Sequence, residues 1–164
     1  MFGAIIGAMF RLTVASPIGP LALQEEAGAV ARLDWGQTSD APSPLLREAA
    51  RQLGAYFAGR RSRFDLPLAP AGTDFQRRVW DGLLAIPYGE TRSYGQLADA
   101  LGSGPRAVGG ALGRNPIPVI VPCHRIVGAA GAPGGYSGRG GLKTKRYLLD
   151  LEAATARFRP PSPA

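Results

Sequence analysis

The chain of 164 residues contains one cysteine and one histidine, and this scarcity excludes several kinds of site. A single cysteine cannot form a disulfide within the chain. A structural zinc site needs several cysteine or histidine ligands, so we expect no metal site and no cofactor. An unpaired thiol is typical of a reducing compartment, so we expect a cytoplasmic protein.

The sequence also lacks a hydrophobic run long enough to cross a membrane. The apolar segment 1–10 is too short to span a bilayer, and no lysine or arginine precedes it as in a signal peptide. We therefore expect no membrane partner, and we interpret residues 1–9 as an extension of little structural value.

Acidic residues are the scarcer of the two charge types. The chain has 12 Asp+Glu against 19 Lys+Arg and a net charge of +7. Such an excess favours a polyanionic partner, and nucleic acid is the leading candidate. Surface charge that serves only solubility is the alternative.

The first part of the chain has the pattern of a small sheet with a helix. Alternating apolar residues over 10–35, interrupted by turns, predict a short antiparallel meander. A helix then begins at Pro44, with Ser43 as its cap, and ends near Gly59. The predicted organisation is an N-terminal domain of residues 1–66, a second domain of residues 67–156 and a disordered tail of residues 157–164.

The second part is mainly helical. Thr73 with Gln76, and Ser93 with Gln96, form capping boxes that each predict the start of a helix. Two short helices joined by a glycine-containing turn at 102–105 outline a helix-turn-helix. The predicted fold class is therefore α+β, a small antiparallel sheet with a helix followed by a helical domain with a winged-helix-like helix-turn-helix.

The second helix of this pair is rich in glycine and alanine, so one of its surfaces has almost no side chains. It contains Ala107, Gly109 and Gly110, with Arg106 and Arg114 on either side. Small residues let a backbone approach a DNA minor groove closely, and the arginines supply positive charge. A helix packed tightly on a core through small residues explains the composition equally well.

The only cysteine, Cys123, directly precedes the only histidine, His124. A thiol is a strong nucleophile as thiolate, and imidazole is the side chain suited to take its proton near neutral pH. A buried cysteine beside a surface histidine is the alternative. Prolines 116, 118 and 122 exclude a helix and predict a rigid, extended, apolar segment before the thiol.

A final helix is predicted over 142–156, after a glycine-rich segment 128–141 that reads as a lid or pocket wall. Glu152 lies four residues after Leu148, near the apolar face of this helix. Paired with His124 it would complete a Cys-His-Glu triad and lower the thiol pKa. An exposed, frayed helix end is the alternative.

The hexapeptide Pro122-Cys123-His124-Arg125-Ile126-Val127, with the upstream segments 106–111 and 114–118, resembles the O6-alkylguanine-DNA alkyltransferases. The resemblance covers residues 73–153 densely and the segment 16–21 more weakly. Arg139-Gly140 reads as an insertion at the pocket rim relative to the family pattern.

The resemblance implies direct, irreversible, stoichiometric transfer of an alkyl group from O6-alkylguanine, and less well from O4-alkylthymine, in double-stranded DNA to Cys123. A monomer would bind the minor groove and flip the damaged base into a pocket. His124 would act as base through a water and Glu152 would orient it. Asn115 would be the hinge before the active-site segment, and Tyr94 would crowd the 3′ phosphate and donate to the base.

The resemblance also implies the remaining contacts. Arg106 would fill the gap left by the flipped base. Ser137 would donate to guanine O6, Tyr136 would form a pocket wall, and the carbonyls of Cys123 and Ile126 would accept from the exocyclic amine. A further contact with the substrate base is assigned to Pro118. Further contacts with DNA are assigned to Thr73, Ser93, Ala107, Gly109, Gly110 and Arg114.

Three other functions fit part of this pattern. A Cys-His-Glu hydrolase would have no use for the Gly/Ala helix with its flanking arginines. A helix-turn-helix regulator would not need Cys123. An alkyltransferase-like protein that binds damage without repairing it usually lacks the cysteine, which this chain has.

Overall fold

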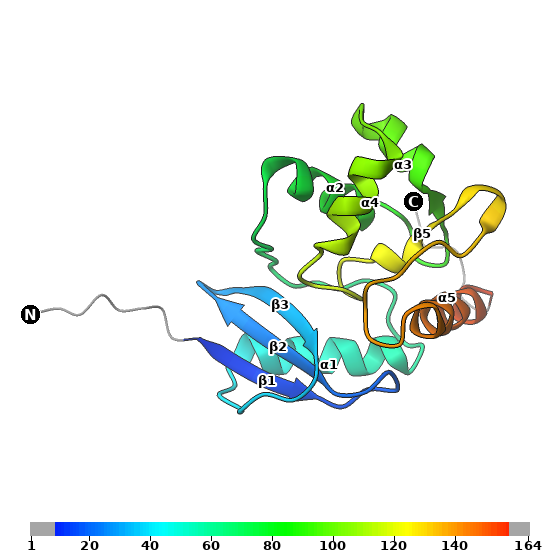
Figure 1. Cartoon of the computed structure of the whole chain (residues 1–164). Coiled ribbons are helices and arrows are strands. Elements are labelled where there is room, and N and C mark those ends of the chain that lie inside the picture. The colour runs from blue at the N-terminus through cyan, green and yellow to red at the C-terminus, as the bar shows by residue number, and fades with distance from the viewer. Residues whose placement is uncertain (1–8, 158–164) are drawn as a thin grey trace, which may run out of the picture. The chain divides into compact units, whose positions relative to one another are not determined.

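The computed structural model describes residues 9–157, and their contacts divide them into two units (Figure 1). The first unit contains the described residues up to Thr73 together with Pro116–Ile120. The second contains Asp74–Asn115 and the described residues from Val121 onward. The division therefore lies after Thr73 and not after residue 66. Most of the predicted tail lies outside the described residues.

The first unit is built on an antiparallel sheet in the order β1-β2-β3. The strands are β1 (Phe10–Val14), β2 (Leu21–Glu26) and β3 (Ala29–Trp35), and Leu12 pairs with Leu23 in the first ladder. The alternating pattern over 10–35 thus predicted the meander correctly.

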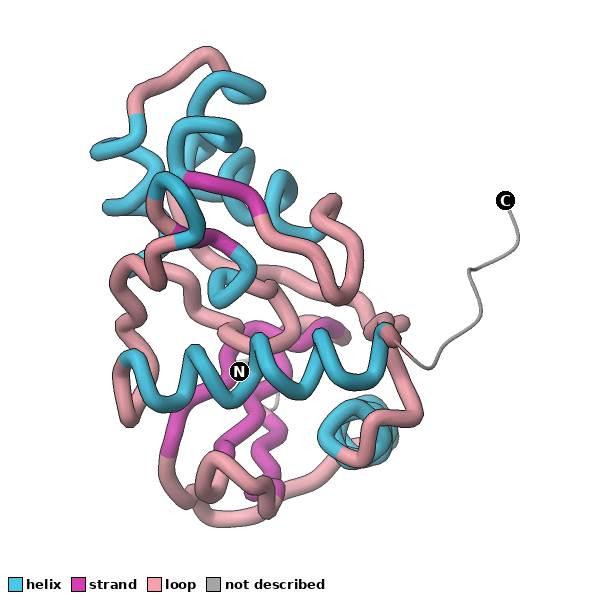
Figure 2. The backbone as a smooth tube through the Cα atoms, turned by 90° about the vertical axis from the view of Figure 1, so that its right-hand side faces the viewer, coloured by secondary structure: helices cyan, strands magenta, loops and turns pink. Residues whose placement is uncertain are grey.

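Helix α1 (Pro44–Phe57) packs against this sheet and is seen end-on beside it in Figure 2. The helix starts where the sequence predicts, because the Ser43 hydroxyl accepts a hydrogen bond from the Leu46 backbone N–H. Leu21 and Leu23 of the sheet and Leu53 of the helix are fully buried, so sheet and helix share one apolar core.

A short segment from later in the chain also belongs to the first unit. The Leu33 backbone N–H donates to the Pro116 carbonyl at 2.9 Å, and Ile117, Val119 and Ile120 are buried. Val119 has a φ of 73°, which turns the chain back. The prediction of a continuously extended segment is therefore wrong, because this turn interrupts it, whereas the predicted apolar environment is confirmed.

The second unit is mainly helical. Its long elements are α2 (Asp74–Leu84), α3 (Tyr94–Leu101), α4 (Pro105–Gly113) and α5 (Leu142–Ala156). The Trp80 indole N–H donates to the Ala111 carbonyl at 2.9 Å, which ties α2 to α4. α3 and α4 form the predicted helix-turn-helix, and no helix among residues 9–157 is long and apolar enough to cross a membrane.

Two short strands position the start of α3 beside the segment that follows the cysteine. Strand β4 (Arg92–Ser93) pairs in parallel with β5 (Ile126–Val127), and β5 directly follows the 3-10 helix η1 (Cys123–Arg125). A second such helix, η2 (Ala129–Gly131), begins the glycine-rich segment. The predicted capping box of Ser93 and Gln96 is confirmed at the start of α3.

Candidate active site

Cys123 opens onto a cavity within the second unit. The thiol residue begins η1, and its exposed fraction is 8%. The cavity has a volume of ≈ 320 Å³. Its described lining residues come from α3, α4, η1 and the glycine-rich segment: Tyr94, Gly109, Leu112, Gly113, Cys123, Gly135, Tyr136 and Ser137.

Asn115 braces the chain on both sides of the Pro116–Ile120 segment. Its side-chain amide donates to the Val121 carbonyl at 2.9 Å. This hydrogen bond links the two residues that flank the Pro116–Ile120 segment of the first unit. The same side chain forms a hydrogen bond with the Cys123 thiol. Asn115 therefore connects the end of α4 to the nucleophile, and its role as a hinge stays a prediction.

The thiol is less acidic here than the triad prediction requires. Burial raises the pKa of Cys123, while the hydrogen bond from Asn115 and the positive charge of Lys145 oppose this effect. The expectation of a lowered thiol pKa is therefore wrong for this structure. The physical reason is desolvation, because burial disfavours the thiolate more than these neighbours stabilise it.

His124 and Glu152 form the predicted pair. Nε2 of His124 lies 2.6 Å from Oε2 of Glu152, and the exposed fractions of the two residues are 0% and 1%. Glu152 is thus neither frayed nor exposed. Burial lowers the pKa of His124 despite the carboxylate, so the ring is neutral and donates its Nε2 proton to Glu152.

The other ring nitrogen of His124 is the one that can act as a base. Nδ1 is buried and has no hydrogen-bond partner among residues 9–157. A neutral ring with its proton on Nε2 carries a lone pair on Nδ1. The Glu152 contact therefore selects the tautomer whose Nδ1 can accept a proton.

Arg125 is a component of the site that sequence reasoning did not identify. Its Nε and Nη2 donate to the two Glu152 oxygens at 2.8 and 3.2 Å, and its Nη1 donates to the Ile86 carbonyl at 2.8 Å. Burial by itself would raise the pKa of Glu152. His124 and Arg125 outweigh that effect and lower it to about 2, so Glu152 is a carboxylate.

The residues predicted to bind the base do not all line the cavity. Tyr94, Tyr136 and Ser137 line it, whereas Pro118 and Ile126 are buried and are not among its described lining residues. The Ile126 carbonyl accepts a hydrogen bond from the Lys145 ammonium at 2.6 Å. Its role toward a base stays a prediction, since a carbonyl oxygen has a second lone pair.

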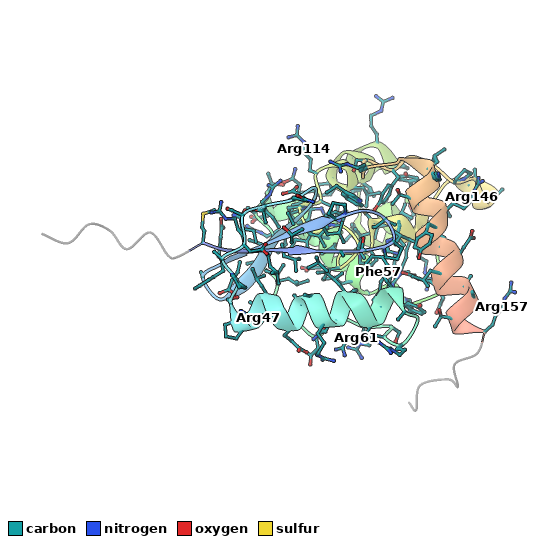
Figure 3. All side chains as sticks on the ribbon, turned by 90° about the horizontal axis from the view of Figure 1, so that it is seen from below. Arg47, Phe57, Arg61, Arg114, Arg146 and Arg157 are labelled. Atoms are coloured by element: carbon teal, nitrogen blue, oxygen red, sulfur yellow. The ribbon has the colours of Figure 1, made fainter. Side chains whose placement is uncertain are left out.

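Helix α4 has two different faces. Val108, Ala111 and Leu112 are buried, whereas its other side is exposed and a Cβ added at Gly110 would meet nothing within 4 Å. Core packing therefore explains only the buried face. The exposed residues are Pro105, Arg106, Ala107, Gly110 and Gly113, together with Arg114 directly after the helix, and Figure 3 shows Arg114 projecting outward.

The other two residues predicted to contact DNA have different settings. Thr73 is exposed immediately before α2, and Ser93 is half-buried. The Ser93 hydroxyl accepts a hydrogen bond from the Gln96 backbone N–H at 3.0 Å. Any contact of this hydroxyl with phosphate would use its remaining hydrogen-bonding capacity.

The predicted insertion is held in place by α5. The Thr144 hydroxyl donates to the Arg139 carbonyl at 2.5 Å. Gly140 has a φ of 87°, and a Cβ there would overlap the Thr144 hydroxyl. Only glycine fits this close approach, so the insertion has a defined conformation beside the helix.

Known domains match nearly all of the described chain. The DNA-binding domain of 6-O-methylguanine DNA methyltransferase matches residues 74–154, and its ribonuclease-like domain matches residues 9–70. A methylated-DNA–protein-cysteine methyltransferase of Mycobacterium bovis is 49% identical over 154 residues, covering 88% of this chain and 92% of that protein. The protein of that name from Methanosarcina barkeri is 44% identical, covering 91% and 100%.

Solved structures agree with these sequence matches. The O6-methylguanine methyltransferase of Mycobacterium tuberculosis has a TM-score of 0.80 and 46% identity, covering 95% of this chain and 97% of its own. An OGT of the same organism in complex with DNA has a TM-score of 0.78 and 51% identity, covering 87% and 92%. These matches confirm the predicted α+β fold. The chain belongs to the 6-O-methylguanine DNA methyltransferase family, the DNA-repair proteins that transfer an alkyl group to a cysteine.

Proposed function

We propose that this protein repairs O6-alkylguanine, and less efficiently O4-alkylthymine, in double-stranded DNA by irreversible transfer of the alkyl group to Cys123. The observation that carries the proposal is the position of Cys123 on a cavity that α4 also lines. The next residue in the chain, His124, is hydrogen-bonded to Glu152. We further propose that it acts as a monomer in the cytoplasm, each molecule repairing one base.

The reaction balances with the groups at the site. The Cys123 sulfur forms a bond to the alkyl carbon as the bond from that carbon to O6 breaks, and the electron pair stays on the guanine. The thiol proton passes through a water to Nδ1 of His124, and the Tyr94 hydroxyl donates its proton to the guanine anion. The proton on His124 then returns to Tyr94 through solvent, so the thiol proton balances the one gained by the base. The product is unmodified guanine and a thioether, and a thioether is a poor leaving group.

The exposed face of α4 suits the DNA side of the reaction. Small residues such as Ala107 and Gly110 permit close approach to a minor groove, and Arg106 would occupy the space vacated by the flipped base. Asn115, at the end of α4, would hold Cys123 in a fixed position relative to that helix through its two hydrogen bonds. Ser137 and Tyr136 would contact the base in the cavity.

Transfer of a radiolabel tests this proposal. Duplex DNA carrying O6-[³H-methyl]guanine is incubated with the protein, and the products are separated on a denaturing gel. We expect label to move to the protein until one methyl group is bound per molecule, and Cys123→Ser to bind the duplex without taking label. A hydrolase would release label to solution. Label on the Cys123→Ser protein would contradict the assignment.

A further inference from the structure

Lys145 is a buried lysine within α5. Its exposed fraction is 1%, whereas its neighbours Lys143 and Arg146 are exposed. The Lys145 Nζ donates to the Ile126 carbonyl at 2.6 Å and to the Gly135 carbonyl at 3.1 Å. Lysine is rarely buried so completely, because removing an ammonium from water is costly unless it is well partnered.

The two carbonyls belong to two chain segments that each contribute residues to the cavity lining. Ile126 follows the η1 segment that carries Cys123 and His124, and Gly135 lies in the glycine-rich segment immediately before Tyr136. One ammonium therefore joins the segment of the nucleophile to the segment that provides Gly135, Tyr136 and Ser137 to the cavity lining. The glycine-rich segment has few side chains of its own with which to fix that spacing.

The charge of Lys145 has no carboxylate partner among residues 9–157. Glu152, the buried carboxylate of the same helix, is engaged by His124 and Arg125. The titratable groups in electrostatic contact with Lys145 are Cys123 and His124, and its charge favours the thiolate of the first and the neutral form of the second. Tyr136 is the other titratable group coupled to Cys123.

We propose that Lys145 is a positioning residue for the transfer reaction: it fixes the segment that follows Cys123 against the glycine-rich segment through the Ile126 and Gly135 carbonyls, and it stabilises the Cys123 thiolate as its counter-charge. The proposal rests on the proposed function only in taking Cys123 as the acceptor. The charge of Lys145 also favours the neutral form of His124, and only the neutral ring can take the thiol proton in the transfer step.

The acidity of the thiol can be measured without DNA. The rate of Cys123 alkylation by iodoacetamide is followed against pH in the wild type and in Lys145→Met, Lys145→Gln and Lys145→Arg, with exposed Lys143→Met as the matched control. An opposite charge at close range shifts a pKa by about 1 unit or more, so we expect alkylation near neutral pH to slow at least about tenfold in the Met and Gln variants. Lys143→Met should resemble the wild type, and Lys145→Arg, which keeps the charge, should slow alkylation less than Lys145→Met. Unchanged profiles in Met and Gln would overturn the proposal.

A second measurement uses the wild-type protein and so does not depend on how the variants fold. The ¹⁵Nζ resonance of Lys145 is titrated before and after Cys123 is converted to a neutral thioether with iodoacetamide. Burial lowers the pKa of Lys145, and the negative charge on Cys123 opposes that effect, so we expect the pKa of Lys145 to fall further after alkylation. The same titration curve in both forms would contradict the counter-charge role. Neither readout involves DNA, so failure of label transfer would leave this test intact.

Discussion

The carboxylate of Glu152 binds His124 through Nε2, at 2.6 Å, and thereby determines which nitrogen of the ring is basic. With the proton of the neutral ring held on Nε2, the lone pair is on Nδ1. His124 and Arg125 together keep Glu152 ionised against the effect of burial, so the orienting group remains a hydrogen-bond acceptor even at low pH.

Replacing this acceptor should slow the transfer step. In Glu152→Gln the side chain can donate to the ring and stabilise the other tautomer, so we expect the single-turnover rate to fall at least about tenfold at neutral pH. The rate should be recorded from about pH 6 to about pH 10, because burial raises the pKa of Cys123 and the wild-type rate should increase toward alkaline pH. The surface variant Glu48→Gln serves as control. Superimposable profiles for Glu152→Gln and wild type would mean that Glu152 is only structural.

Most of this site was predictable from local sequence. Neighbours along the chain place Cys123 beside His124, and the position of Glu152 relative to Leu148 indicates its helix face. The environment of the thiol was not predictable, because desolvation depends on what covers Cys123 in three dimensions. The burial of Lys145 was hidden for a related reason, since it lies in a charged run typical of a solvated helix.

Arg106 should matter for duplex repair and not for bond formation. We expect Arg106→Ala to slow repair of O6-methylguanine in duplex DNA while sparing reaction with the free base O6-benzylguanine, provided that the cavity admits it. Exposed Arg51, paired with Glu48 on α1, gives the control Arg51→Ala. Equal losses on duplex and free base would contradict the role in base flipping.

The small exposed residues of α4 should be required for close approach to DNA. A leucine at Gly110 meets open space in the protein, so Gly110→Leu should fold normally and yet bind duplex DNA more weakly. Gly54 on α1 is equally open and exposed, so Gly54→Leu is the matched control. Affinities should be measured at a fixed salt concentration. Equal affinity of both variants for duplex would contradict the minor-groove face.

Acid should destabilise the fold through His124 and Glu152. Both have folded-state pKa values below their ordinary values of 6.5 and 4.5, so the unfolded state takes up protons first as pH falls. Stability should therefore decrease from about pH 6.5 down to about pH 2, with Glu152 contributing on the order of 3 kcal/mol.

Urea midpoints recorded against pH would measure this effect. The dependence of stability on pH below about pH 4.5 should become weaker in Glu152→Gln. It should persist in Glu48→Gln, because Glu48 pairs with Arg51 on the surface, where water and salt screen the interaction. An unchanged slope in Glu152→Gln would show that the buried carboxylate does not control acid unfolding.

Arg139-Gly140, which the sequence predicts to be an insertion, should influence which adducts are repaired. Thr144→Val removes the hydroxyl that binds the Arg139 carbonyl while keeping the side-chain shape. We expect the rim to loosen and the rate ratio of O6-benzyl to O6-methyl substrates to rise. Thr155→Val, which removes a hydroxyl bound to Leu151 within α5, is the control. An unaltered ratio would mean that the insertion does not shape the cavity.

The turn at Val119 shows why fold prediction from sequence failed in one place. Alternating prolines indicate extended chain, and a β-branched residue strongly disfavours positive φ. The structure nevertheless has a φ of 73° there, because the burial of Ile117, Val119 and Ile120 in the first unit overrides the local preference. The strands and helices whose signals lie within a few residues, such as α1 after Ser43, were predicted correctly.

The return of Pro116–Ile120 to the first unit makes the two units interleaved rather than modular. No single cut of the backbone separates them, since a fragment beginning at Asp74 retains a loop whose apolar residues have lost their core. A chimaera joined at Thr73 would therefore not contain the second unit as an independently folding domain. If the N-terminal sheet were exchanged between relatives, the segment Pro116–Ile120, which packs with that sheet, would have to be exchanged with it.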